Sequence, residues 1–380
     1  MDFLRKLNRI IAVAMILFAW SESQAMIVGS SCLTRNIEEA KQNKLVLLYD
    51  KHALDGSYSI KMGHVEDMQA LINGLAKNKG LAKNKDKVPF FVEISERHND
   101  PVIRDNVSAV LSPGNVAIKL ALDNDMQYKN ITFIPFDPRK HCDYWMRDMV
   151  LQSDQFAQAI KQKHRFPSHF YDVTPVKLLN HLKARLISVK DEIELLPVSQ
   201  VVKDQDYAMS KKRYEDCDKI IRTLLQSHSV GEEQHFIDLI AQLNSAETGD
   251  LFATLLEEQS FSVEMALLAK VVKLSQKNPL CVVHAGAYHS HTIEKRLLSQ
   301  FKGFEKDASC SMTLPGLVLD NLLTLKYPTE VPNNFMNKNM KHFIAIDHEK
   351  TDTSTSDSDY ENEQRLMAKR VVDAGECIIS

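Results

Sequence analysis

The sequence predicts an α/β fold, in which a mostly parallel central sheet is flanked by helices and carries a large α-helical insertion. Four short apolar runs of strand length support it, at residues 44–50, 88–95, 131–136 and 280–285. Apolar residues at helical spacing follow the first and the last run. Strands that alternate with helices form parallel sheets, because right-handed crossovers return the chain to the same edge.

The predicted helices are recognised by their apolar stripes. Met68, Leu71, Ile72 and Leu75 lie on one helical face after the first run. Residues 151–275 show helical spacing and almost no strand signal. We expect this insertion to cap the edge of the sheet, where it would exclude water and shape a pocket.

The N-terminus is typical of an export signal. Arg5, Lys6 and Arg9 precede an apolar run at residues 10–20, and small residues end the segment at Ala25. We expect cleavage after Ala25 and a mature protein in the periplasm or outside the cell. The apolar run is too short for a permanent membrane anchor, and no later stretch approaches spanning length.

The chain divides into six predicted regions. An acidic, Ser- and Thr-rich stretch without apolar period marks a flexible linker near the C-terminus. The regions are a signal peptide (1–25), the N-terminal half of the α/β domain (26–150), the helical insertion (151–275), the C-terminal half of the α/β domain (276–346), the acidic linker (347–363) and a C-terminal helix or tail (364–380).

Charge and cysteine content exclude some classes of function. The 47 basic and 50 acidic residues give a net charge of −3, which does not favour nucleic acid as a partner. Six cysteines without a Cys-x-x-Cys pair argue against a structural zinc site, and their disulfide pairing stays open. We expect Cys281, inside an apolar run, to be a buried free thiol.

Ionisable side chains stand where each predicted strand ends, and parallel pairing would bring these ends to one edge of the sheet. They are Asp50, His52, Glu93, Glu96, Asp137, Arg139 and His289. His289 is the leading candidate, since it follows a turn at Gly286 and begins a helix whose N-terminal dipole keeps imidazole neutral. We expect His284, inside its strand, to be a hydrogen-bonded core histidine.

The segment 286–289 (GAYH), followed by a helix and Gly303, resembles the C-terminal Gly-x-x-His motif of the superfamily that unites erythromycin-esterase-like, ChaN-like and TraB/TIKI proteins. The segment 92–94 (VEI) is similar to the family's strand that bears a glutamate, and 49–52 (YDKH) stands where the first motif is expected, with Tyr49 in place of glycine. The resemblance implies two histidines and a glutamate meeting at the carboxyl edge of the sheet.

These residues predict a hydrolase that cleaves an ester or peptide bond. His52, Glu93 and His289 form a two-histidine, one-carboxylate set that suits zinc, manganese, iron or cobalt. Glu93 or Glu96 would take a proton from water, and Arg139 would hold an anionic group or the developing oxyanion. Without metal, the same histidine and glutamate would act as a general-base pair.

Two other functions stay open. A haem- or iron-binding protein, as the ChaN-like branch implies, would use the same histidines, with Tyr288 as a further ligand. A degenerate secreted member would keep the fold and bind a partner without catalysis, which the tyrosine at position 49 favours. The substrate, a small molecule or a peptide, is not identified by the sequence.

Overall fold

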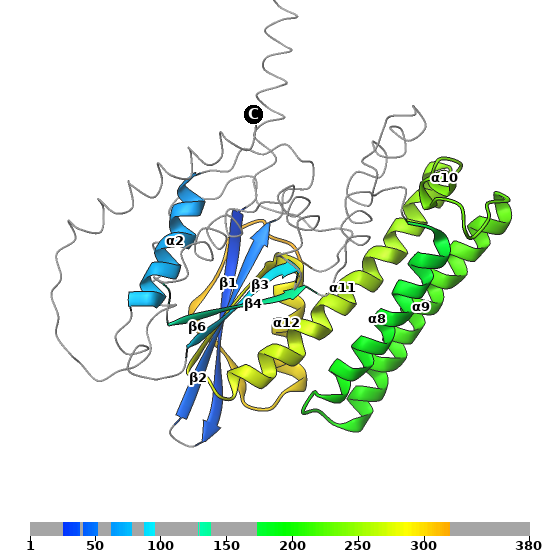
Figure 1. Cartoon of the computed structure of the whole chain (residues 1–380). Helices are drawn as coiled ribbons and strands as arrows, with labels where there is room; N and C mark the ends of the chain where they lie inside the picture. Colours follow the sequence, from blue (N-terminus) through cyan, green and yellow to red (C-terminus); the bar gives the residue numbers. More distant parts are fainter. Residues whose placement is uncertain are drawn as a thin grey trace, which may run out of the picture.

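A six-stranded sheet forms the centre of the computed structural model, which describes residues 26–38, 41–51, 62–77, 87–95, 128, 130–137 and 173–319 (Figure 1). The strand order is β4-β3-β5-β2-β1-β6. The strands are β1 (Met26–Glu38), β2 (Lys41–Lys51), β3 (Val88–Ser95), β4 (Ile131–Asp137), β5 (Leu280–Gly286) and β6 (Phe304–Thr313).

Four neighbouring strands are parallel and end at the same edge of the sheet. β5 pairs in parallel with β2 and with β3, and β3 pairs in parallel with β4. In this register Asp50 lies opposite Gly286, and Val92 lies opposite His284. The predicted α/β class with a mostly parallel sheet is therefore confirmed.

Two antiparallel strands, β1 and β6, were not predicted. β1 forms a hairpin with β2, which begins at Lys41, three residues before the predicted run. β6 pairs with the other side of β1 and forms an edge of the sheet. β6 mixes buried and exposed positions and β1 contains Gly, Ser and Thr, so neither has the continuous apolar run that marks the parallel strands.

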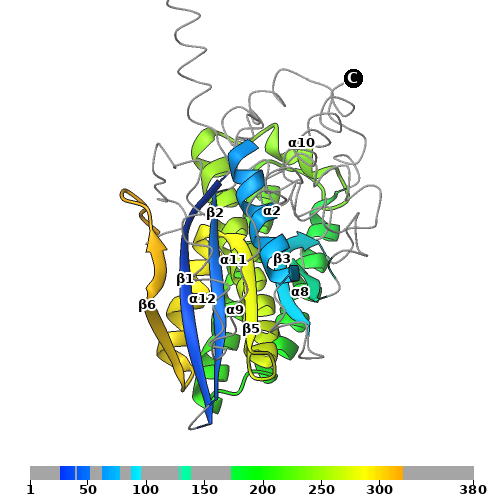
Figure 2. The same cartoon turned by 90° about the vertical axis from the view of Figure 1, so that its left-hand side faces the viewer.

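Helices cover both faces of the sheet. α2 (Met62–Lys77) lies on one side, while α11 (Ser245–Ser275) and α12 (Ala287–Gln300) lie on the other (Figures 1 and 2). The apolar stripe of α2, from Met68 to Leu75, is buried as predicted and belongs to the same core as the strands. This core fixes the sheet between two helical layers.

Residues 175–275, within the predicted insertion, are helical throughout most of their length. α8 (Pro175–Glu194), α9 (Gln200–Ser227) and α10 (Phe236–Ile240) precede α11. α8 begins with Thr174 as N-cap and proline in its first turn, and α11 begins with a capping box between Asn244 and Glu247. The helices share a second apolar core, and α11 joins it to the sheet. The bundle lies along one face of the sheet (Figure 1).

The described cysteines form one disulfide and two free thiols. Cys32 of β1 and Cys310 of β6 form a disulfide that joins these two strands. Cys217 and Cys281 are buried free thiols, which confirms the prediction for Cys281. Within the same residues, no helix has the length and apolar character that a membrane crossing requires.

Gly303 illustrates how tightly the turn after α12 is built. Its φ is +88°, and a Cβ at this position would lie 3.0 Å from the carbonyl oxygen of Asn36. We expect Gly303→Ala to lower the free energy of unfolding by about 1–3 kcal/mol, since both the backbone conformation and the contact are unfavourable for alanine.

Urea unfolding followed by circular dichroism measures this loss. Gly249→Ala is the matched control, because Gly249 lies in α11 with no atom within 4 Å of the added Cβ, and alanine favours the helix. Equal stability of the Gly303→Ala variant and the wild type would contradict the interpretation of this turn.

Candidate functional site

The carboxyl edge of the sheet brings Glu93 of β3 next to the start of α12. Gly286 ends β5 and is the N-cap of α12, and its backbone N–H donates to Glu93 Oε2 at 2.6 Å. His289 lies in the first turn of α12. A strand end and a helix start, almost 200 positions apart in the sequence, are therefore joined directly by this hydrogen bond.

Two carboxylates face the imidazole of His289. Its Nδ1 lies 3.2 Å from Glu264 Oε1, and its Nε2 lies 3.9 Å from Glu93 Oε1. The three residues are only 6–8% exposed. Because a carboxylate accepts hydrogen bonds, the pair with Glu264 places the proton on Nδ1 and leaves the Nε2 lone pair directed away from Glu264.

This arrangement holds the imidazole in one orientation. Glu264 belongs to α11, so its carboxylate is fixed by a helix that packs on the sheet. The 3.9 Å between Nε2 and Glu93 is too long for a hydrogen bond, so these two atoms do not satisfy each other. A neutral imidazole held in this way can accept a proton at Nε2 or ligate a metal ion through it.

Tyr288 borders the same site. Its ring meets that of His289 edge to face, with 6.1 Å between the ring centres. Burial and the nearby charge of Glu264 raise the pKa of the Tyr288 hydroxyl. Tyr288 therefore stays a neutral hydrogen-bond donor at the border of the site.

The structure brings together two of the predicted site residues, Glu93 and His289. His52, Glu96 and Arg139 lie outside the described residues, as does the side chain of Asp137. Among the residues that are described, no group of three or more His, Cys, Asp or Glu side chains has the arrangement of a metal site. The predicted third ligand thus falls on a part of the chain without a described position.

Sequence reasoning missed Glu264. It stands in the run FSVEMALLA, where it is an acidic residue among buried neighbours on α11. A carboxylate in such a position needs a polar partner, so the acidic residue within this apolar run is a signal in the sequence itself. Helical spacing alone could not identify the partner, since His289 lies 25 residues further along the chain.

The chain passes from strand to helix at Gly286, where the turn was predicted, but this turn does not require glycine. Its φ of −48° and ψ of 140° belong to a region that any residue can adopt. The strand continues directly into the helix, and Gly286 contributes its N–H to Glu93.

A second histidine–carboxylate pair lies inside the sheet. His284 and Asp50 are both fully buried, with 3.1 Å between His284 Nε2 and Asp50 Oδ2. Leu48 lies opposite His284 in the register, so Asp50, two residues further, shares its face, whereas Tyr49 points to the other. His284 is buried in the core as expected and contacts the Asp50 carboxylate, but within the described residues neither of its ring nitrogens makes the predicted hydrogen bond.

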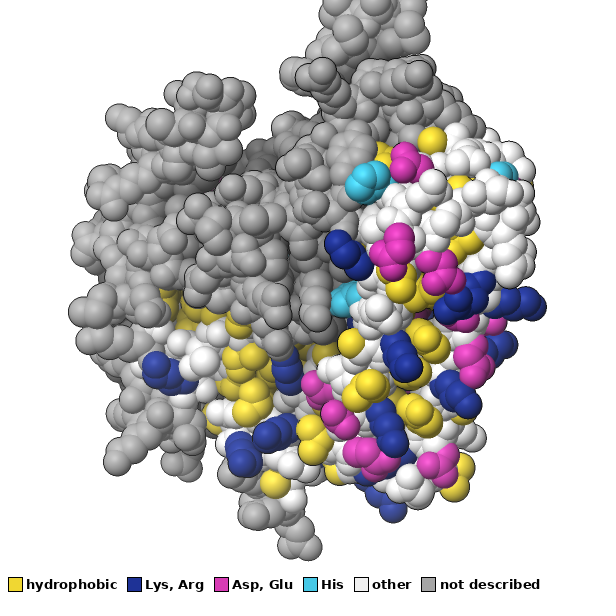
Figure 3. Space-filling model, turned by 45° about the vertical axis from the view of Figure 1, so that its right-hand side comes forward, with side chains coloured by type: hydrophobic (Ala, Val, Ile, Leu, Met, Phe, Trp, Pro, Cys, Tyr) yellow, Lys and Arg dark blue, Asp and Glu magenta, His cyan; other side chains and the backbone are white. Residues whose placement is uncertain are grey.

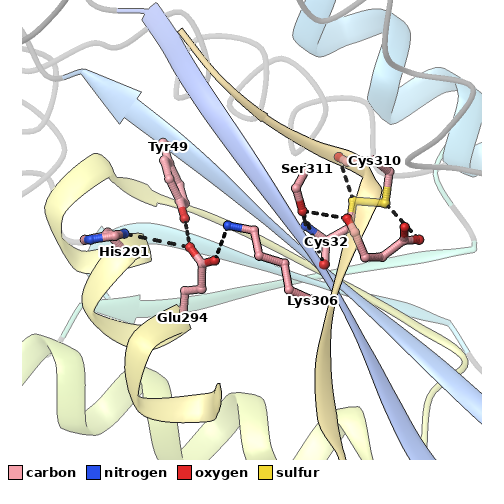
Figure 4. Close-up of polar contacts among 8 residues, drawn as sticks. Cys32, Tyr49, His291, Glu294, Lys306, Cys310 and Ser311 are labelled. Carbon is pink, nitrogen blue, oxygen red and sulfur yellow. Dashed lines mark hydrogen bonds and ion pairs between the residues drawn. A yellow bond between two sulfur atoms is a disulfide. The ribbon is translucent and has the colours of Figure 1, made fainter. Parts of the chain in front are cut away.

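Tyr49 joins a polar network on the face of the sheet covered by α12 (Figure 4). Its hydroxyl donates to the carboxylate of Glu294, which also lies 2.7 Å from Lys306 Nζ and 3.8 Å from His291 Nδ1. The opposing position on β1 is Gly29, where a Cβ would come within 3.0 Å of the Tyr49 ring. Tyr49 thus connects β2 to α12 and leaves no room for a larger residue at position 29.

The network sets the charge of Glu294. Burial raises the pKa of its carboxyl, but the nearby His291 and the hydrogen bonds from Lys306 and Tyr49 outweigh burial and hold the pKa at about 2, below the ordinary 4.5. Burial and the adjacent carboxylate raise the pKa of the Tyr49 hydroxyl, which remains a donor. Glu294 is therefore ionised at neutral pH and fastens the helix that carries His289.

We expect Glu294→Gln to make the free energy of unfolding less dependent on pH in the acid range. A depressed native pKa stabilises the folded state above the unfolded pKa, and this contribution disappears as the pH falls from about 4.5 toward 2. The free energy of unfolding of the variant should be up to about 3 kcal/mol lower than that of the wild type at neutral pH. It should also depend less on pH below pH 4.5. Urea unfolding across this range tests it, with the exposed Glu215→Gln as control. An unchanged acid limb would contradict the role of Glu294.

No protein-family model matches the chain. Comparisons with curated proteins and with solved structures gave no match either. The resemblance to the erythromycin-esterase-like, ChaN-like and TraB/TIKI superfamily therefore stays a prediction, based on the motif residues alone.

Proposed function

We propose that this protein is a hydrolase that cleaves an ester or peptide bond, with His289 as its general base at the carboxyl edge of the sheet. The observation that carries the proposal is the unequal environment of the two imidazole nitrogens. Nδ1 is held by Glu264 at 3.2 Å, whereas Nε2 faces Glu93 at 3.9 Å without bonding to it. A general base needs one nitrogen that is oriented and one that is available.

The described residues supply the proton transfers of such a reaction. Nε2 takes a proton from water while the water oxygen adds to the carbonyl carbon of the substrate. The proton then passes to the leaving oxygen or nitrogen as its bond to that carbon breaks. Glu264 stabilises the imidazolium that forms between the two steps, and Glu93 Oε1 can accept a hydrogen bond from the attacking water. Gly286 keeps Glu93 in place through its N–H.

A divalent metal ion fits part of this donor set. Zinc, manganese, iron or cobalt would be held by His289 Nε2, Glu93 and the predicted third ligand, His52. A carboxylate on the second nitrogen, as Glu264 provides, is the usual support of a metal-bound histidine. When bound, such an ion would lower the pKa of a water ligand.

We also propose that the protein works outside the cytoplasm. The basic and apolar N-terminal segment and the small residues before position 26 support export. The Cys32–Cys310 disulfide agrees with an oxidising compartment, because such bonds rarely persist in the cytosol.

We expect His289→Gln to lower kcat/KM for a hydrolysed ester or peptide by about 10²–10⁴-fold, since it removes the base. Glu264→Gln should lower kcat less than His289→Gln does. The amide can still contact Nδ1 but lacks the charge that stabilises the imidazolium. A panel of nitrophenyl esters and fluorogenic peptides provides the assay. His291→Gln is the matched control on the same helix, since His291 contacts Glu294 instead of the site.

The measured variants must retain the folded state, which circular dichroism and the unfolding midpoint establish. If folded His289→Gln hydrolysed the same substrates as fast as the wild type, His289 would not be the base. If the wild type hydrolysed none of the panel, a hydrolase of ordinary esters and peptides would be excluded.

Metal analysis of the mature protein tests the metal-dependent form of the proposal. We expect stoichiometric metal in the wild type, and a large loss in His289→Ala and in His52→Ala, because each removes one ligand. His291→Ala should keep the wild-type content. Equal metal content in all four proteins would remove the metal-dependent form and leave the His289–Glu264 base.

A further inference from the structure

We infer that the substrate carries an anionic oxygen group, a carboxylate or a phosphate, and that Arg213 binds it. This inference rests on the proposed function, because it describes the substrate of the same site. Its basis is the juxtaposition of a half-buried arginine without a carboxylate partner and the surface of α11 that carries Glu264.

Arg213 belongs to α9, and two contacts hold its side chain against α11. Its Nη1 donates to the backbone oxygen of Glu257, and its guanidinium carbon lies 5.0 Å from the centre of the Phe261 ring. Phe261 and Glu264 are three residues apart on α11, so they lie on the same side, about 4.5 Å apart along the helix axis. The guanidinium therefore packs on the part of α11 that directly precedes Glu264, the residue that holds His289.

The charge of Arg213 is not neutralised by an ion pair with any described residue. Its two contacts are a carbonyl oxygen and an aromatic ring, both uncharged. Other arginines of the helical region are paired with carboxylates: Arg185 with Glu258, Arg222 with Asp218 and Arg296 with Asp206. Arg213 is half-buried, so part of its side chain stays in contact with solvent.

A guanidinium in this setting suits an oxyanion. Its planar fork matches the two oxygens of a carboxylate or phosphate, and the stacking on Phe261 fixes the plane before a ligand binds. Acidic and basic side chains are intermixed over the coloured helices in Figure 3. The preference for an anion would therefore come from Arg213 itself rather than from a broad positive surface.

Calorimetric titration of the mature chain tests the site without requiring turnover. The probes are inorganic phosphate, glutarate and the neutral analogue glutaramide. We expect the wild type to bind phosphate or glutarate and not glutaramide, and Arg213→Gln to bind the anion about 10–100-fold more weakly, as expected for one charge-assisted bidentate contact. Arg213→Lys should bind with intermediate affinity, since it keeps the charge and loses the fork.

Arg222→Gln is the matched control, because it removes an arginine from the same helix that already has carboxylate partners. It should bind the anion as the wild type does. An Arg213→Gln variant with wild-type anion affinity, or a wild type that binds neither anion, would overturn the inference. The stronger of the two anions identifies carboxylate or phosphate as the preferred group.

Turnover separates this inference from the proposed function. With a nitrophenyl ester of glutarate and its neutral methyl-capped form, Arg213→Gln should raise KM about 10–100-fold for the charged ester and leave the neutral one unchanged. Anion binding at Arg213 without any hydrolysis would refute the proposed function alone. If both esters were hydrolysed and Arg213→Gln left the KM of each unchanged, the inference alone would be refuted.

Discussion

The parallel pairing of β5 with β2 and β3 is the constraint on which the rest of the structure depends. It brings the ends of three strands, far apart in the sequence, to one edge of the sheet. The Gly286 N–H, left without a helical partner at the start of α12, then meets Glu93 at the end of β3. A displaced register would separate this pair and remove one hydrogen-bond donor from a buried carboxylate, which is costly.

Around this edge, α11 has two physical roles. Its apolar residues join the core of the sheet to the core of the helical bundle. One carboxylate, Glu264, interrupts this apolar surface and holds His289. The same helix positions Arg213 through Phe261 and the Glu257 backbone. The helical region and the sheet thus form one unit at the site, so its geometry is tied to the packing of the whole fold.

The opposite faces of β2 explain why Tyr49 is compatible with this arrangement. Asp50 points to the face of His284, whereas Tyr49 points to α12 and bonds Glu294. The side chain of Tyr49 therefore does not enter the described part of the site. It fastens the helix that presents His289, while the close approach to Gly29 accommodates its ring.

The sequence by itself determined the parallel strands, the helical character of residues 175–275 and the candidates Glu93 and His289, because continuous apolar runs and helical spacing are local signals. It did not reveal β1 and β6, which lack such runs. Only the tertiary structure decided that Glu264 holds His289 and that the Gly286 N–H donates to Glu93. These contacts depend on how helices pack against the sheet and on which strands pair. The spacing of residues along the chain does not show which distant side chains such packing brings together.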